Sequence, residues 1–258
     1  MPISLARARP YSGLEASRQV HHSRFDMLTH RRKSELDARD AGWINARYHF
    51  IVRPTGNPEH LPLGPLIVWN DDEIAPGTGF PMHSHRNLEI ISYVREGAVS
   101  HADDAGGRGR TAAGDVQVMS AGRGIRHEEY NRDETPLKLF QIWLESNQRD
   151  AQPGWQSRPF PRELRAGQLV TLASGLPGDD DAVPIRANAR VMGATLKLGQ
   201  EVRHRLLPGS QAYLVPSTGA LLVNGEAVGA GDGVAVTDEA EIVITAATDA
   251  EVVLVEVQ

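Results

Sequence analysis

The sequence predicts an all-β protein built from two consecutive β domains. From residue 47 onward, short runs rich in β-branched and aromatic residues alternate with Gly, Pro, Asn and Asp clusters, which is typical of a sandwich or barrel. The 258 residues, 40% of them hydrophobic, suffice for two domains with separate cores. A histidine followed by two β runs around a glycine occurs at residues 83–99 and again at 204–223, which indicates a weak internal repeat.

The β runs divide the chain into four segments. Residues 1–40 lack strong periodicity and are predicted to form an N-terminal extension, partly helical near residues 25–36. Residues 149–168 contain three prolines among polar neighbours and are predicted to be a linker. The two domains then cover residues 41–148 and 169–258. Their predicted strands lie at 48–52, 66–69, 88–94, 116–119 and 137–144, and at 169–172, 190–198, 212–215, 220–223, 233–236, 241–246 and 251–257.

Composition excludes several classes of protein. The absence of cysteine rules out disulfides, zinc-thiolate sites, Fe–S clusters and thiol nucleophiles. No apolar run approaches the length of a membrane helix, and the basic, polar N-terminus lacks the apolar segment of a signal peptide, so a cytoplasmic location is expected. The net charge is −6, and residues 169–258 carry five basic against twelve acidic residues, which argues against nucleic-acid binding.

The sharpest chemical signal is the pair His83 and His85. Successive side chains of a strand point to opposite faces, so two histidines at this spacing project the same way and can grip one ion. The pair alone is weak support for a metal site, because the chain has ten histidines and some will fall at this spacing by chance. Ordinary hydrogen-bonding histidines of the surface or core are the alternative interpretation.

A second pair with the same spacing, His127 and Glu129, follows 44 residues later. Brought together across a barrel, the two pairs supply three imidazoles and one carboxylate, which leaves open positions on a six-coordinate ion. Mixed imidazole and carboxylate donors suit Fe(II), Mn, Ni or Cu, and the lack of thiolate argues against a structural zinc site. The predicted cofactor is one divalent metal ion, with Fe(II) as first choice and Mn, Ni, Cu or Zn as alternatives.

The stretches around these pairs resemble known motifs. Residues 79–89 (GFPMHSHRNLE), running on to Glu96 and Gly97, resemble the first cupin motif, and residues 114–131 (GDVQVMSAGRGIRHEEYN) resemble the second cupin motif in the form seen in the pirin family. Residues 70–76 and 139–145 are also similar to bacterial pirin-like proteins. The resemblance extends from about residue 42 to the end of the chain and is most specific in the first half.

The resemblance implies a bicupin, which is a pair of tandem jelly-roll β-barrels, with metal in the N-terminal cupin only. The positions that match the family ligands are His83, His85, His127 and Glu129. The C-terminal cupin is expected to be degenerate: His204 takes the place of the first pair, but residue 206 is leucine and no His-x-Glu sequence follows. A metal ion there would lack ligands.

Some members of the pirin family are quercetin 2,3-dioxygenases, which open the central ring of a flavonol with O2 and release carbon monoxide. The resemblance therefore implies a metal-dependent dioxygenase acting on a flavonol or related aromatic enol, with Glu129 as the catalytic proton acceptor. Other members are reported as redox-sensing regulators, so the alternative is a non-catalytic iron-binding sensor with a protein partner. A third interpretation is a cupin that binds a sugar or another small molecule without redox chemistry.

Neighbouring residues are given supporting roles. Glu89 is predicted to orient a ligand imidazole rather than to bind metal itself. His101 is interpreted either as a pocket residue or as an ordinary barrel histidine. The substrate is predicted to lie at an apolar barrel mouth lined by Phe80, Met82, Met119 and Phe140.

Overall fold

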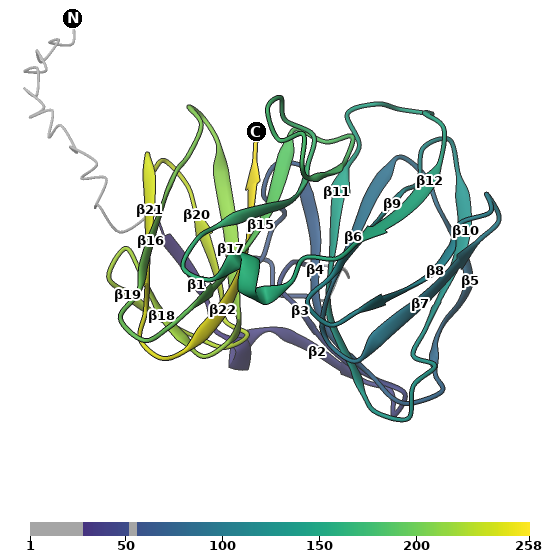
Figure 1. Cartoon of the computed structure of the whole chain (residues 1–258), viewed down its shortest axis with the longest axis horizontal. Helices are drawn as coiled ribbons and strands as arrows, with labels where there is room; N and C mark the ends of the chain where they lie inside the picture. Colours follow the sequence, from purple (N-terminus) through teal and green to yellow (C-terminus); the bar gives the residue numbers. More distant parts are fainter. Residues whose placement is uncertain (1–27, 52–55) are drawn as a thin grey trace, which may run out of the picture.

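The computed structural model describes residues 28–51 and 56–258. These residues form two β-barrels that lie side by side, and their only helices are two short 3-10 turns (Figure 1). Within the described residues no helix is long and apolar enough to cross a membrane. The predicted all-β class with two cupin barrels is confirmed.

The first barrel consists of one seven-stranded and one four-stranded sheet. Its strands are β2 (Asp37–Asp40), β3 (Ile44–Tyr48), β4 (Leu66–Ile74), β5 (Gly79–His85), β6 (Leu88–Glu96), β7 (Ala98–Asp103), β8 (Arg108–Ala112), β9 (Val116–Ser120), β10 (Ile125–Tyr130), β11 (Leu137–Glu145) and β12 (Gly154–Arg158). The larger sheet has the order β12-β9-β6-β11-β4-β3-β2, and the smaller has the order β5-β10-β7-β8.

The second barrel is built in the same way. Its strands are β1 (Leu28–Arg31), β13 (Val170–Ser174), β14 (Val183–Pro184), β15 (Ala189–Leu196), β16 (Glu201–Arg205), β17 (Gln211–Thr218), β18 (Ala220–Val223), β19 (Glu226–Gly229), β20 (Gly233–Val236), β21 (Glu241–Ala246) and β22 (Ala250–Val257). The larger sheet has the order β1-β20-β17-β22-β15-β13-β14, and the smaller has the order β16-β21-β18-β19.

The strand orders show that the internal repeat is a complete eight-stranded unit. Strands β9-β6-β11-β4 of the first barrel match β20-β17-β22-β15 of the second, and β5-β10-β7-β8 match β16-β21-β18-β19. Each of β4 to β11 therefore has a counterpart eleven strands later. This correspondence allows the two barrels to be compared position by position.

The described part of the expected N-terminal extension belongs to both barrels. Strand β1 pairs with β20 of the second barrel, and β2 pairs with β3 of the first. Between them lies the 3-10 turn η1 (Lys33–Glu35), so the helix expected at residues 25–36 is absent from the residues described there. The guanidinium of Arg31 is buried and donates to the carbonyl of His49 over 2.6 Å, which anchors β1. Residues 1–27 lie outside the described residues.

The segment predicted as a linker also has regular structure. Strand β12 pairs with β9 at the edge of the first barrel, and the 3-10 turn η2 (Arg162–Arg165) follows. Arg165 is fully buried and donates to the hydroxyl of Tyr93 over 2.9 Å. It also lies 3.3 Å from a carboxylate oxygen of Glu251 on β22, so this turn ties the two barrels together.

The two barrels share a hydrophobic core. Trp69 of the first barrel is fully buried, and its ring centroid lies 5.4 Å from that of Phe140 and 5.5 Å from that of Tyr213 in the second barrel. Aliphatic side chains of β22, such as Val253 and Val255, complete the cluster. Phe140 therefore points away from the barrel mouth, and its predicted place in the substrate pocket is wrong.

Candidate metal centre

Three histidines meet at one end of the first barrel. Strand β5 carries His83 and His85 on one face, and its antiparallel pairing with β10 sets His127 opposite His83. The ring centroid of His127 lies 4.4 Å from that of His83 and 5.1 Å from that of His85. One nitrogen from each ring lies within 4.8 Å of the others, as ligands of a single ion require. The structure thus brings the three predicted imidazoles together.

Burial keeps His85 and His127 neutral, as metal ligands must be. It lowers the pKa of His127 to about 2, with a further contribution from the neighbouring rings, and it lowers the pKa of His85 to about 4. The Nδ1 atom of His83 lies 2.8 Å from the carbonyl oxygen of Pro81. Since a carbonyl only accepts, Nδ1 of His83 carries the proton, and its Nε2 lone pair faces His127.

Glu129 is buried like His127, with only 2% of the residue exposed. Strand β10 keeps a regular register with β7 through both residues, so Glu129 faces the barrel interior as His127 does, and the extra residue of the irregular β5–β10 pairing lies in β5. Three side chains donate to it: Ser92 over 3.2 Å, Gln117 over 2.5 Å and Gln141 over 2.7 Å. Burial raises the pKa of Glu129 to about 7, although these hydrogen bonds oppose the rise.

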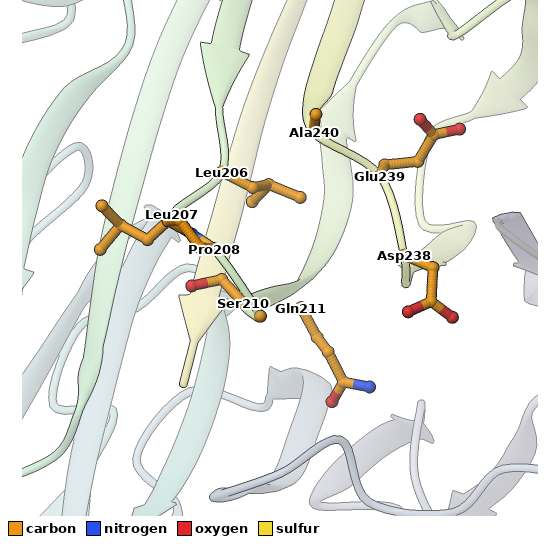
Figure 2. A pocket seen from close by; sticks show the side chains of 9 residues that line it. Leu206, Leu207, Pro208, Ser210, Gln211, Asp238, Glu239 and Ala240 are labelled. Carbon is orange, nitrogen blue, oxygen red and sulfur yellow. The ribbon is translucent and has the colours of Figure 1, made fainter.

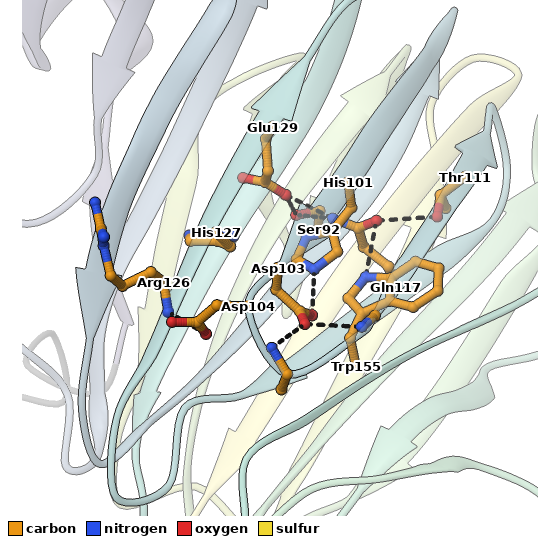
Figure 3. Close-up of polar contacts among 12 residues, drawn as sticks. Ser92, His101, Asp103, Asp104, Thr111, Gln117, Arg126, His127, Glu129 and Trp155 are labelled. Carbon is orange, nitrogen blue, oxygen red and sulfur yellow. Dashed lines mark hydrogen bonds and ion pairs between the residues drawn. The ribbon is translucent and has the colours of Figure 1, made fainter.

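The carboxylate of Glu129 falls in a second ligand group with His101 and His127, whose donor atoms also lie within 4.8 Å of one another. His127 is therefore common to both groups. Figure 3 shows Glu129 above His101, with His127 beside them and Asp103 below. The ring of His101 stacks on Trp155 with centroids 5.0 Å apart, and its Nε2 lies 2.9 Å from Asp103.

Apolar side chains border the site. Trp143 of β11 stands edge-on to His85 with ring centroids 4.8 Å apart. It packs with Leu88 and Trp155 against a buried cluster that includes Met119 and Ile125. Of the residues predicted to line the mouth, Met119 lies in this cluster, whereas Met82 is 40% exposed. Phe80 packs edge-on against Trp43, and its ring centroid also lies 6.3 Å from that of His83.

Glu89 does not contact the imidazoles. It shares the face of β6 that carries Ile91 and Tyr93, which both belong to the core between the barrels. Ser120 donates to its carboxylate over 2.6 Å. The predicted role in orienting a histidine is therefore not what the structure shows, because the alternation of β6 directs Glu89 toward the second barrel.

The second barrel holds no comparable cluster among its described residues. The pairing of β16 with β21 sets His204 opposite Ile242, and the equivalent pair in the first barrel is His85 opposite Ile125. It also sets Val202 opposite Ile244, and the equivalent pair is His83 opposite His127. The counterpart of His83 is therefore Val202, and that of His85 is His204. The sequence-based match, which set His204 and Leu206 against His83 and His85, is off by two residues. Nε2 of His204 lies 2.9 Å from the buried carboxylate of Glu256.

A pocket of about 460 Å³ opens at the corresponding end of the second barrel (Figure 2). It is lined by two loops, residues 206–211 between β16 and β17 and residues 238–240 before β21. Its polar side chains, Ser210, Gln211, Asp238 and Glu239, include no imidazole. Among the described residues, the groups that could hold a metal ion therefore lie in the first barrel.

The residues of the first barrel fit a divalent transition-metal ion. Nε2 of His85 and Nδ1 of His127 are buried and have no hydrogen-bond partner among the described residues. Neutral imidazoles and one carboxylate are the donors that such ions prefer, and the chain has no thiolate to compete. An unpaired buried nitrogen costs free energy, which a bound ion would recover.

Comparison with known proteins identifies the relatives of this fold. The family model described as Pirin matches residues 25–144, and that described as the quercetinase C-terminal cupin domain matches residues 171–257. A pirin-like protein of Caulobacter vibrioides is 50% identical over 230 residues, which cover 89% of this chain and 99% of the relative. The chain belongs to the pirin family. A quercetin 2,3-dioxygenase of Escherichia coli is 31% identical over 229 residues, covering 88% of this chain and 97% of the relative.

Solved pirin structures agree with the bicupin architecture. The bacterial pirin YhhW from Escherichia coli, in complex with nickel(II), superposes with a TM-score of 0.83 at 30% identity. The match covers 90% of this chain and 99% of that chain. The expected family and fold are thus confirmed, and a metal-bound relative exists with the same architecture.

Sequence reasoning missed the polar side chains that surround Glu129 in this pirin. Ser92, Gln117 and Gln141 lie inside otherwise apolar β runs, and each faces the barrel interior. A single polar residue on the inward face of such a run is the signal that could have revealed them. Trp155 was also missed, because it lies in the segment predicted as a linker, whose residues do not indicate a strand.

Proposed function

We propose that this pirin is a metal-dependent dioxygenase of the quercetin 2,3-dioxygenase type, acting on a flavonol or a related aromatic enol with O2. The observation that supports the proposal most strongly is the convergence of three imidazoles beside a buried carboxylate, in a chain related over nearly its whole length to a quercetin 2,3-dioxygenase. The ligand set is His83, His85 and His127 with Glu129. The ion is Fe(II) by preference, and Mn, Ni, Cu and Zn remain alternatives.

The ion would supply a Lewis acid that binds and acidifies the flavonol hydroxyl, together with redox chemistry for O2. Glu129 would accept the hydroxyl proton. In the metal-free site burial raises the pKa of Glu129 to about 7, which favours a proton on this carboxylate more than on an ordinary glutamate. Gln117 and Gln141 would hold that carboxylate in place while the proton moves.

The apolar side chains beside the histidines would position a planar substrate. Trp143 stands next to His85, and Leu88 packs against the same cluster. Aromatic faces at this position favour stacking with the rings of a flavonol, and their bulk limits the access of water.

The proposal is tested by measuring O2 uptake and carbon monoxide release with quercetin. The metal-loaded protein should show both, and a His83→Ala/His85→Ala variant should lose both because two of the ligands are removed. His204→Ala, which changes the corresponding histidine of the second barrel, is the matched control and should retain activity. A metal-loaded protein that consumes no O2 with any of several flavonols would contradict the proposal and would favour the redox sensor.

A further inference from the structure

We propose that the first barrel offers a second, inner position for the metal ion, formed by His101, His127 and Glu129. The outer position is the proposed site, formed by His83, His85 and His127 with Glu129. The donor atoms of the inner group lie within 4.8 Å of one another, and all three residues are at most 2% exposed, whereas His83 and His85 are partly open to solvent. The inference rests on the metal binding in the proposed function but not on flavonol cleavage.

Asp103 fixes the ring of His101 in the form that a metal ligand requires. Its Oδ1 accepts the backbone N–H groups of Ala105 over 2.9 Å and Gly107 over 2.8 Å, and its Oδ2 lies 2.9 Å from Nε2 of His101. A carboxylate in this setting only accepts, so Nε2 carries the ring proton. Nδ1 of His101 is left with a lone pair, buried and without a hydrogen-bond partner among the described residues.

This arrangement of carboxylate, histidine and free nitrogen is the one that proteins use behind metal-bound histidines. The stack on Trp155, with ring planes only 6° apart, fixes the orientation of the imidazole as well. Gly107 packs so closely on Asp103 that an added Cβ would lie 2.2 Å from a carboxylate oxygen. The histidine is therefore held in one tautomer and one orientation.

The ring of His127 is set in the same way. Nδ1 of His83 donates to Pro81, so its Nε2 must accept, and the Nε2 of His127, 3.1 Å away, donates to it. Nδ1 of His127 then carries the lone pair, and it too is buried without a partner among the described residues. Both inner imidazoles thus have lone pairs ready for a cation before any proton is rearranged.

Glu129 completes the inner position with negative charge. Three hydrogen bonds hold its carboxylate in place, and two oxygens with four lone-pair sites leave room for a metal bond. Because both positions use His127 and the carboxylate of Glu129, they are alternatives for one ion.

The experiment uses Co²⁺ as a probe, since its visible absorption reports the coordination of the ion. The metal-free His83→Ala/His85→Ala variant, which lacks the outer position, is titrated with Co²⁺ beside the wild-type protein. The same variant with His101→Phe added keeps a ring against Trp155 but has no donor nitrogen. Far-UV circular dichroism of each protein checks the fold.

The proposal expects the His83→Ala/His85→Ala variant to bind one Co²⁺ per chain with visible bands, and the added His101→Phe to abolish those bands. Asp103→Asn in the same background should weaken Co²⁺ binding by about 10- to 100-fold, as loss of a carboxylate behind a ligand histidine does. Asp104→Asn, an exposed neighbour, is the matched control and should have no effect.

Two results would overturn the inner position. One is a folded His83→Ala/His85→Ala variant that binds no Co²⁺ while the wild type does. The other is Co²⁺ binding by that variant that survives His101→Phe unchanged. Failure of flavonol turnover with intact Co²⁺ binding would count against the proposed function alone, so the two proposals fail separately.

Discussion

The two barrels have the same strand order and different interiors. In the first barrel His83 faces His127 across the β5–β10 pair, whereas the equivalent β16–β21 pair places Val202 opposite Ile244. The second interior is one continuous aliphatic cluster. In the first barrel two smaller hydrophobic clusters accompany the polar residues around Glu129. The fold therefore supplies a scaffold, and a few side chains decide whether it carries a metal centre.

The buried acids of the two barrels differ as well. In the second barrel, burial alone would raise the pKa of Glu256, but donors from His204 and the backbone of Leu207 hold that pKa below its ordinary value. In the first barrel, burial raises the pKa of Glu129 to about 7 and that of Asp72 to about 8. The first barrel thus keeps carboxylates whose charge is not compensated, as expected of a site that awaits a cation.

Among substitutions that test this difference between the barrels, the largest effect is expected at Glu129. Glu129→Gln should reduce the rate of quercetin cleavage by about 10²- to 10⁴-fold at saturating metal, because the proton acceptor is lost while the shape is kept. Glu256→Gln, the same change in the second barrel, should leave the rate unchanged. O2 uptake by the metal-loaded variants measures both. Equal effects of the two substitutions would show that the barrels do not divide their roles.

The shared core should respond next most strongly. Trp69→Ala removes the largest fully buried side chain and should lower the free energy of unfolding by roughly 3–5 kcal/mol. Because Trp69 packs on Tyr213 of the second barrel, both barrels of the wild type should unfold in one transition. Urea titration monitored by circular dichroism measures this. Leu198→Ala, at a side chain that is 70% exposed, should change stability by less than about 0.5 kcal/mol. Two separate transitions in the wild type would contradict a common core.

Asp72 should show a smaller, pH-dependent effect. Burial, reinforced by the neighbouring Asp71, raises its pKa from 3.8 to about 8, so the unfolded chain releases this proton first as the pH rises. The wild type therefore loses stability between about pH 4 and pH 8. Asp72→Asn should stabilise the metal-free protein at pH 8 and have little effect at pH 4, because the buried charge that it removes is present only at the higher pH. Thermal melts of variant and wild type at both pH values test this. An equal change in melting temperature at pH 4 and pH 8 would contradict the raised pKa of Asp72.

The smallest effect is expected at His204. His204→Ala should change neither the metal content nor the rate of quercetin cleavage. The second-barrel residues that correspond to His83 and His127 are the aliphatic Val202 and Ile244, so His204 has no partner ligands. Metal analysis and O2 uptake check this. A loss of bound metal would mean that the second barrel contributes a site after all.

Much of the fold could be predicted from local patterns. The spacing of His83 with His85 and of His127 with Glu129 fixed the relevant strand faces, because side chains alternate along a strand. Strand register could not be read in the same way: the sequence matches His204 to His83 and Leu206 to His85, whereas the strand pairing matches Val202 to His83 and His204 to His85. The irregular pairing of β5 with β10, in which β5 has one extra residue between Phe80 and His83, is not visible in the sequence either.

Two edge strands, β1 and β12, were also not predicted from the sequence. Leu28–Arg31 and Gly154–Arg158 are short and each gains its backbone hydrogen bonds from a distant partner, β20 and β9. Their own residues carry little β pattern, so the segments looked like an extension and a linker. Pairing with remote strands overrides local propensity in such places.

The central claim is that the imidazoles of the first barrel hold one metal ion, and His127 is common to both proposed positions. The most direct measurement is the metal content of wild-type and His127→Ala proteins after saturation with Fe(II) or Ni²⁺ and removal of free ions. One ion per chain in the wild type and none in a folded His127→Ala variant is the predicted result. A wild type that retains no ion, or a His127→Ala variant that retains as much as the wild type, would contradict the account.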